Sequence, residues 1–377
     1  MKVARRVELI NPSPTLKISS IAKQLSREGK DVVDMSVGEP DFKTPQRIIE
    51  AAYRAMNEGK VFYTPTKGIP ELLDAIAEKM RRENKVDATA ENVIVTPGAK
   101  YAIFEAMMSL VDEGDEIILF DPSWVSYEAC ALMAGGKVIW VPHSEDFSDV
   151  PVEEFVSPKT KMIIVNTPSN PLGVVYGKEF LKKIRDIALD EDIFVMSDEI
   201  YEKIIFKGTH YSIASFEDMF DKTITINGFS KTYSMTGWRI GYAVAPKWII
   251  EKMNVIQSHS VSHPTSFVQF AAIEALKRDD SFLREMVMEF KRRRDMIMER
   301  LDELGISYAP PNGAFYIFMN VGRDGDKFCE EFLKKEYVAL IPGSAFGVSF
   351  KNWVRLSYAI SREEISEFLR RFERFIS

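Results

Sequence analysis

The stretch GFSKTYSMTGWRIG, residues 228–241, joins two apolar runs of the chain. Lys231 follows the run TITIN (223–227), and Arg239 opens the run RIGYAVA (239–245). A lysine desolvated at the end of a buried strand has a lowered pKa, which makes its amine a nucleophile toward an aldehyde. The planar guanidinium of Arg239 suits a phosphate group. The stretch therefore predicts a reactive amine and a phosphate-binding cation at strand ends.

Short apolar runs alternate with segments of helical length outward from this stretch. The runs are 92–97, 115–120, 137–142, 161–166, 192–197, 223–227 and 239–245, and the helical segments include 98–111, 123–134 and 177–190. Several runs are apolar throughout, which is typical of strands buried on both faces of a mostly parallel sheet. The alternation predicts an α/β protein. The last run follows its predecessor too closely for a helical crossover and is predicted to be antiparallel.

The C-terminal part of the chain predicts a second, smaller domain. Segment 246–300 is typical of long helices, and the basic run KRRR within it (291–294) is interpreted as a solvated helix face. Three apolar runs and an amphipathic helix follow, at 313–320, 338–346, 353–359 and 362–377. We predict a large domain over 46–275, a small domain over 276–377, and an N-terminal segment, 1–45, that joins the small domain.

Composition narrows the function classes. The net charge is −7 and the sequence pI is about 5.5, which argues against nucleic acid as a partner. Cys130 and Cys329 are the two cysteines, without CxxC spacing, which fits a reducing compartment and no thiolate zinc site. The start lacks an apolar signal region, and no apolar run reaches the ~18 residues of a membrane span. We expect a cytoplasmic protein with no membrane partner.

Polar residues follow several of the predicted strands. Gly98, Ala99 and Lys100 start a predicted helix, whose N-terminus suits a phosphate. Asn170 lies in the turn-rich loop TPSNPLG (167–173), and Asp198 follows DIFVM (192–196). Each position has an ordinary alternative, namely a strand-to-helix turn, turn chemistry or a surface turn. Ligands bind beyond the carboxyl ends of strands in such sheets, so these side chains are expected near one site.

Together these features match the needs of pyridoxal 5'-phosphate (PLP). The cofactor needs a lysine that forms an imine, a phosphate-binding arginine, a helix N-terminus, and an acid that keeps its ring nitrogen protonated. In this respect the chain resembles the class I aminotransferases of the fold-type I PLP superfamily. The residues that carry the resemblance are GFSKTYSMTGWRIG and GEPDF (38–42), and the likeness extends from about residue 5 to the end. It lies nearest the prokaryotic aspartate aminotransferases, with aromatic-amino-acid aminotransferases next.

The resemblance implies a fold and a set of catalytic roles. The fold is a mostly parallel seven-stranded sheet in a large domain, plus a smaller α+β domain. Lys231 would form the imine and move the Cα proton, and Asp198 would pair with the ring nitrogen. Tyr201 and Asn170 would hydrogen-bond the ring oxygen, and Trp124 would stack on the ring.

The resemblance also implies how the phosphate and the substrate bind. The phosphate ligands would be Gly98, Ala99, Ser230 and Arg239, and Lys100 would also belong to the cofactor site. Tyr63 would reach the phosphate of a neighbouring subunit, which makes the active unit a homodimer with shared active sites. Arg355, assisted by Gly38, would clamp the substrate α-carboxylate. The remaining substrate contacts would come from Lys100, Ser13, Trp124 and Asn170.

The substrate predicted from this resemblance is aspartate, with 2-oxoglutarate as acceptor and ping-pong transfer to oxaloacetate and glutamate. Lys100 and Ser13 match residues that bind the distal carboxylate in similar bacterial enzymes. Aromatic or broad specificity is the alternative, because the same pocket often admits phenylalanine or tyrosine. Two departures are Gly228, where many relatives carry a phosphate-contacting serine, and Asn11, where some relatives that use prephenate carry lysine.

Other chemistries fit the sequence less well. A PLP-dependent C–S lyase shares much of the cofactor frame, and a PLP-binding regulator would need a fused DNA-binding module. None of the 20 glycines stand in G-x-G spacing, which argues against a dinucleotide-binding dehydrogenase. His259 and His263 stand one helical turn apart, but no acidic or thiol partners cluster nearby in sequence. We therefore expect no metal site.

Overall fold

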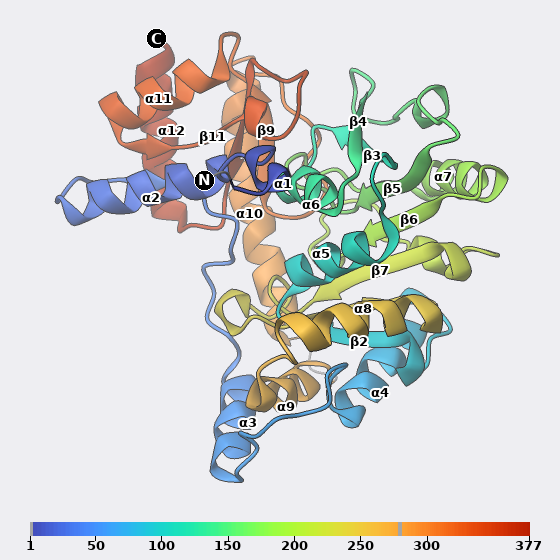
Figure 1. Cartoon of the computed structure of the whole chain (residues 1–377). Coiled ribbons are helices and arrows are strands. Elements are labelled where there is room, and N and C mark those ends of the chain that lie inside the picture. Colours follow the sequence, from blue (N-terminus) through green and yellow to red (C-terminus); the bar gives the residue numbers. More distant parts are fainter. Residues whose placement is uncertain (1–2, 278–280) are drawn as a thin grey trace.

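A seven-stranded sheet forms the centre of the computed structural model, which describes residues 3–277 and 281–377 (Figure 1). In spatial order its strands are β2 (Val93–Thr96), β8 (Gly241–Val244), β7 (Thr223–Gly228), β6 (Phe194–Asp198), β5 (Thr160–Asn166), β3 (Glu116–Asp121) and β4 (Lys137–Pro142). Strand β8 runs antiparallel to both neighbours, and the other strands are mutually parallel. The α/β fold class and the antiparallel run are thus confirmed.

Helices cover both faces of this sheet because alternate residues of each buried strand point to opposite sides. The helices are α3 (Gln46–Asn57), α4 (Pro70–Lys79), α5 (Ala99–Leu110), α6 (Val125–Ala134), α7 (Lys178–Asp190), α8 (Lys247–Ser260) and α9 (Ser266–Ala275). Ile117 and Leu119 of β3 pack in one cluster with residues of α5, α6 and α8, whereas Ile118 and Phe120 pack with residues of α7. A third cluster joins α3, α4 and α9 to the β2–β8 end of the sheet.

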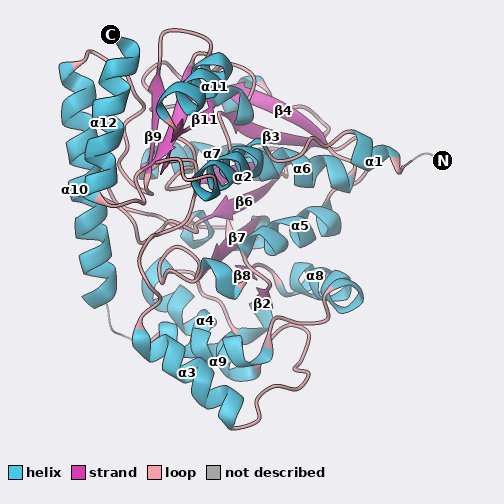
Figure 2. Ribbon diagram, turned by 90° about the vertical axis from the view of Figure 1, so that its left-hand side faces the viewer, coloured by secondary structure: helices cyan, strands magenta, loops and turns pink. Residues whose placement is uncertain are grey.

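The C-terminal elements pack with the N-terminal segment from α2 onward, whereas α1 (Arg5–Glu8) contacts α6. The elements that pack together are α2 (Pro14–Arg27), β1 (Val33–Asp34), α10 (Ser281–Glu303), β9 (Tyr316–Asn320), α11 (Gly325–Glu336), β10 (Val338–Ala339), β11 (Ile341–Pro342), β12 (Trp353–Ser357) and α12 (Arg362–Ile376). Figure 2 shows α10 and α12 side by side, and Val33 shares a buried cluster with both helices. Strand β1 pairs with β10, so residues 33–34 join the C-terminal part. The boundaries at 45 and 275 stay a prediction.

Two sequence expectations need correction. The run 338–346 is not one strand: β10 pairs with β1, β11 pairs with β12, and a turn follows Pro342, which has no N–H for a ladder. The run 291–294 is not wholly solvated. Arg293 is buried and pairs with Asp41 at 2.7 Å, and Arg294 is buried with its guanidinium 4.8 Å from the ring centroid of Phe206.

Long apolar helices are absent from the described part of the chain. Across residues 3–277 and 281–377, no helix is both long enough and apolar enough to span a bilayer. The predicted helical segment 246–300 consists of α8, α9 and α10, and residues 278–280 within it lie outside the described residues.

Candidate active site

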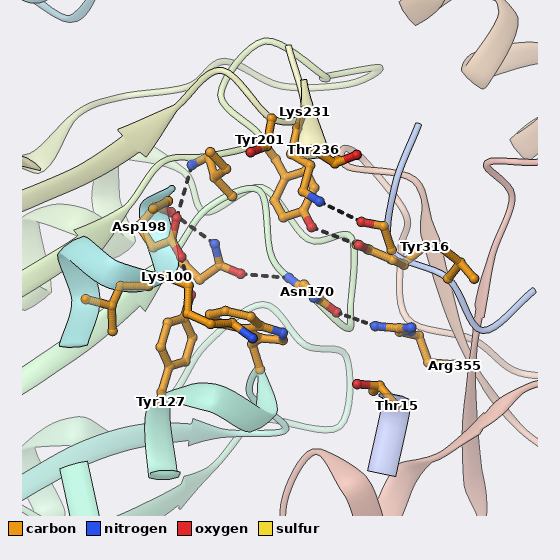
Figure 3. Close-up of a pocket in the computed structure, with 18 of the residues that line it drawn as sticks. Thr15, Lys100, Tyr127, Asn170, Asp198, Tyr201, Lys231, Thr236, Tyr316 and Arg355 are labelled. Carbon is orange, nitrogen blue, oxygen red and sulfur yellow. Dashed lines mark hydrogen bonds between the residues drawn. The ribbon is translucent and has the colours of Figure 1, made fainter. Parts of the chain in front are cut away.

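A cavity of about 390 Å³ lies beyond the carboxyl ends of the parallel strands. Asn166 and Asp198 end β5 and β6, and Lys231 follows β7 (Figure 3). The predicted residues that line it are Gly38, Ala99, Lys100, Trp124, Asn170, Asp198, Tyr201, Ser230, Lys231, Arg239 and Arg355. The structure therefore brings most of the predicted site residues together at one place.

Lys231 holds an amine inside this cavity. Its Nζ donates a hydrogen bond of 2.6 Å to the carbonyl oxygen of Gly38. Burial lowers the pKa of Lys231 to about 8. The nearby cations Arg239 and Arg355 also lower this pKa, whereas Glu39 raises it. An amine with this pKa is partly unprotonated near neutral pH, so it can act as a nucleophile or a base.

Asp198 presents a buried carboxylate to the cavity. Its Oδ2 accepts a hydrogen bond of 2.6 Å from the hydroxyl of Tyr127, and its Oδ1 accepts one of 3.1 Å from the amide of Ile200. Burial raises the pKa of Asp198 to about 6, and the two hydrogen bonds oppose that rise. Asn166 donates a hydrogen bond of 3.0 Å to the backbone oxygen of Asp198. The site thus offers an anion suited to a cationic nitrogen.

Arg355 is a buried guanidinium whose hydrogen-bond partners are neutral. Its Nη1 donates to Asn170 Oδ1 at 3.1 Å, and its Nη2 donates to the carbonyl oxygen of Ser36 at 2.6 Å. Its buried Nε has no hydrogen-bond partner among the residues that the structure describes. Burial lowers the pKa of Arg355. A cation buried in this way is suited to an anionic ligand such as a carboxylate.

Two tyrosines contact each other on the wall of the cavity. The hydroxyls of Tyr201 and Tyr316 lie 2.8 Å apart, and the guanidinium of Arg355 lies 4.6 Å from the ring centroid of Tyr316. A Cβ atom on Gly38 would come within 2.7 Å of the Tyr316 hydroxyl. Glycine at position 38 therefore leaves room for this tyrosine.

The turn before α5 carries the predicted phosphate site. Gly98 has a φ of +86°, and a side chain there would collide with the guanidinium of Arg239. Arg239 donates hydrogen bonds of 2.9 and 3.3 Å to the backbone oxygens of Thr236 and Pro97. Ser230 is buried beside them on the cavity wall. The first turn of α5 and two side chains thus converge where an anion would gain from the helix dipole.

Lys100 and Trp124 form another wall of the cavity. The Nζ atom of Lys100 lies 4.9 Å from the ring centroid of Trp124, which is a cation–π contact. Partial burial lowers the pKa of Lys100, and the nearby Arg239 lowers it further. Cys130 has the opposite effect, but it does not outweigh burial. Lys100 and Arg239 also line a second hollow, of about 480 Å³, next to the cavity.

Three predicted residues do not line the cavity. Gly98 lies behind Arg239, and Tyr63 is 91% exposed with its ring 5.4 Å from that of His263. Ser13 caps α2 and shares a hydrogen bond of 2.8 Å with Thr15, which lines the cavity instead (Figure 3).

Several lining residues carry no role in the sequence prediction. They are Thr15, Leu16, Ser19, Ser36, Val37, Ile103, Tyr127, Asn166, Ile200, Thr236 and Tyr316. Two of them could have been found from the sequence. Asn166 ends a predicted strand, and Tyr127 lies about one helical turn after Trp124.

Known proteins with similar sequences and structures point to one family. The family model for aminotransferase class I and II matches residues 30–372. An aspartate aminotransferase from Bacillus subtilis is 43% identical, covering 100% of this chain and 99% of that protein. An aromatic-amino-acid aminotransferase from Thermococcus litoralis is 39% identical, covering 100% and 98%. A solved Thermus thermophilus aspartate aminotransferase with maleate has a TM-score of 0.96 and 40% identity, covering 99% of both chains.

Proposed function

Because the chain belongs to the class I and II aminotransferases, we propose that it transfers the amino group of L-aspartate to 2-oxoglutarate with PLP as cofactor. The products would be oxaloacetate and L-glutamate, formed in two half-reactions at one site. The observation that carries this proposal is the placement of Lys231, Asp198 and Arg355 around one cavity.

The residues of the cavity fit PLP. The Asp198 carboxylate accepts hydrogen bonds only from neutral donors among the described residues, so it could accept a protonated ring nitrogen. Arg239, Ser230 and the first turn of α5 would hold the phosphate, and Tyr201 would face the ring oxygen. When bound, PLP withdraws electrons from the Cα atom of the amino acid and so makes its C–H bond acidic.

The chain itself supplies binding and proton transfer. The Lys231 amine, with its pKa lowered to about 8, would take a proton from Cα and return one to the cofactor. Arg355 would bind the α-carboxylate with its guanidinium, because it lines the cavity and its hydrogen-bond partners are neutral. Asn170 already accepts a hydrogen bond from Arg355, so it would orient the guanidinium toward the substrate.

The preference for aspartate rests on the cations of the cavity wall. Lys100, a cation on the cavity wall, would attract the distal carboxylate. The similar Thermus thermophilus enzyme was solved with maleate, which is a dicarboxylate. An aromatic or broad-specificity aminotransferase is the second candidate. The Thermococcus litoralis relative and the apolar lining residues Leu16, Ile103 and Trp124 favour it.

The proposal includes a homodimer in the cytoplasm. An exposed apolar run consists of Val61, Phe62 and Tyr63, and such a surface is suited to contact with a second copy of the chain. That contact would bring Tyr63 of one copy to the phosphate site of the other. Cys130 and Cys329 are free and buried, in keeping with a reducing compartment.

A panel of amino donors with 2-oxoglutarate tests the function. We expect aspartate to give oxaloacetate with the highest kcat/KM of the panel. Borohydride reduction followed by peptide mass spectrometry should find the reduced cofactor attached to Lys231. A higher kcat/KM for phenylalanine or tyrosine would favour the aromatic alternative. Pyruvate and ammonia from cysteine-type donors without any 2-oxoacid would indicate a C–S lyase, and label on another lysine would contradict the assigned site.

A further inference from the structure

The turn after β6 presents side chains in two directions. Asp198 and Tyr201 line the cavity, whereas Glu199 and Glu202 are buried and do not line it. The amide of Glu202 donates a hydrogen bond of 2.9 Å to the carbonyl oxygen of Glu199, which closes the turn. Asp198 is joined by a peptide bond to Glu199, and Tyr201 is joined in the same way to Glu202. Contacts that fix the two glutamates therefore also fix Asp198 and Tyr201.

Glu199 is held by four hydrogen-bonding groups. Its Oε1 accepts from the hydroxyls of Ser197 at 3.0 Å and Ser212 at 2.7 Å. Its Oε2 accepts from Asn84 Nδ2 at 2.9 Å and lies 3.1 Å from His210 Nε2. Both oxygens of this fully buried carboxylate are therefore satisfied.

Glu202 is held by a second, connected set. Lys79 Nζ donates to its Oε1, Asn84 Nδ2 donates to its Oε2 at 2.6 Å, and His210 Nε2 lies 3.8 Å from Oε2. Lys79 also donates to Asn84 Oδ1 at 2.7 Å. Burial alone would raise the pKa of Glu202, but Lys79 and His210 outweigh it and lower the pKa to about 2.

The charges of this cluster balance only with a cationic His210. Lys79, Asn84, Glu199, Glu202 and His210, here called the Lys79–His210 network, contain two carboxylates and one ammonium. Burial would lower the pKa of His210, but the facing Glu199 and Glu202 outweigh it and raise that pKa. An imidazolium at His210 would supply the second positive charge.

Other titratable groups near the network do not alter this balance. Glu83 and Lys203 pair with each other at 2.7 Å. Burial raises the pKa of Tyr233 and of Tyr242, which keeps both phenols neutral.

Glu199, Glu202 and His210 also resemble a metal site, with ligand atoms within 4.8 Å of one another. The Lys79 ammonium already contacts Glu202, however, so together with a cationic His210 it would neutralise the network without a metal.

We propose that the Lys79–His210 network is a positioning device for Asp198 and Tyr201, and that His210 acts in it as a cation. Without that cation, the Glu199 charge would be uncompensated directly behind Asp198, and the turn would shift to relieve it. The inference rests on the proposed function, because the turn it positions would hold PLP.

Two variants separate charge from packing. In H210Q the network keeps a hydrogen-bond donor but carries an excess negative charge. In E199Q/H210Q the charges balance again, and the new side-chain amide at position 199 can donate to the Ser197 and Ser212 hydroxyls while its oxygen accepts from Asn84. The matched control is H143Q, since His143 is partly buried like His210 but bonds to Tyr176 and the Asp121 backbone.

The measurements are the PLP dissociation constant of the full-length protein after cofactor removal, and the pH midpoint of the visible absorbance of the bound cofactor. We expect H210Q to bind PLP about tenfold more weakly with a shifted midpoint, E199Q/H210Q to recover to within about threefold, and H143Q to match the parent. Parent-like values in H210Q, or a double variant as impaired as H210Q, would overturn the inference. A parent protein that binds no PLP would instead refute the proposed function.

Thermal unfolding without cofactor gives an independent readout. The pKa of His210 is higher in the folded protein than its value of about 6.5 in the unfolded chain. Protonation of His210 therefore stabilises the fold fully below about pH 6.5, and this stabilisation is lost as the pH rises through the pKa of the folded state. The Tm difference between parent and H210Q should therefore be larger at pH 6 than at pH 9. Burial lowers the pKa of His143 to about 4, so H143Q should show no such change over this range. An equal Tm difference at both pH values for H210Q would contradict a charged His210.

Discussion

The hydroxyl of Tyr127 donates a hydrogen bond of 2.6 Å to Asp198, which ties helix α6 to the end of β6. Trp124, at the start of the same helix, lines the cavity. One helical turn thus carries both a wall of the cavity and the group that steadies its carboxylate. Because the bond favours the ionised form of Asp198, Tyr127 acts on the proposed cofactor through another residue.

Removing this hydroxyl should shift the acid limb of the pH profile. In Tyr127→Phe the pKa of Asp198, already raised to about 6 by burial, should rise further because an opposing hydrogen bond is lost. We expect kcat at pH 6 to fall by roughly tenfold, since one such bond contributes about 1.5 kcal/mol, with a smaller loss at pH 8. Steady-state kinetics from pH 5 to 9 measures this. Tyr176→Phe, another buried tyrosine, serves as control, and equal losses at all pH values would contradict the explanation.

Replacing the buried guanidinium should impair substrate binding more than cofactor binding. Arg355→Lys keeps a positive charge but loses the planar fork and its contacts with Asn170 and the Ser36 backbone. We expect kcat/KM for aspartate to fall roughly 30-fold or more, because disrupting a buried charge pair costs at least about 2 kcal/mol. The visible absorbance of bound cofactor should persist. Arg294→Lys controls for loss of a buried arginine elsewhere, and a variant with parent-like KM would remove Arg355 from substrate binding.

Local sequence patterns reveal several of the residues that the structure brings together at the cavity. Asp198 and Lys231 each follow an apolar run, and the topology rule for α/β sheets places such residues at one edge. Tyr316 was missed because it reaches the cavity through contact with Tyr201, 115 residues away, which joins strand β9 to the turn after β6. No pattern in a single sequence encodes such a contact.

The start of α2 shows a smaller difference from the prediction. Ser13 and Thr15 lie two residues apart and their hydroxyls share a hydrogen bond of 2.8 Å, but only Thr15 lines the cavity. The prediction named Ser13 by resemblance, and the structure places Thr15 on the wall. Likewise, the pairing of Lys79 with Glu202 spans 123 residues and left no signal in either segment.

The Lys100 ammonium should matter for acidic substrates only. In Lys100→Met the wall keeps its length and apolar contact with Trp124 but loses its charge. We expect kcat/KM for aspartate to fall roughly tenfold or more, as charge-assisted hydrogen bonds contribute about 1.5–3 kcal/mol, while phenylalanine changes less than threefold. Lys161→Met, which removes a lysine over Phe194, is the matched control. Equal losses for both substrates would exclude Lys100 from substrate discrimination.

A buried acid on α5 should limit stability at high pH. Glu105 is fully buried, and neither carboxyl oxygen has a hydrogen-bond partner in the described part of the chain. Burial raises the pKa of Glu105 to about 9, so the folded protein keeps a proton that the unfolded chain releases above about pH 4.5. Stability is therefore lost as pH rises from about 4.5 to 9.

Neutral variants should remove this loss. We expect Glu105→Gln to raise the free energy of unfolding at pH 8 by roughly 1–3 kcal/mol and to have little effect at pH 5, with Glu105→Met at least as stable. Urea unfolding at both pH values, followed by circular dichroism, measures the difference. Glu113→Gln is the control, because Glu113 is exposed and its charge is solvated. A gain for Glu105→Gln that is the same at pH 5 and pH 8 would show that packing, rather than the buried carboxyl, sets the stability.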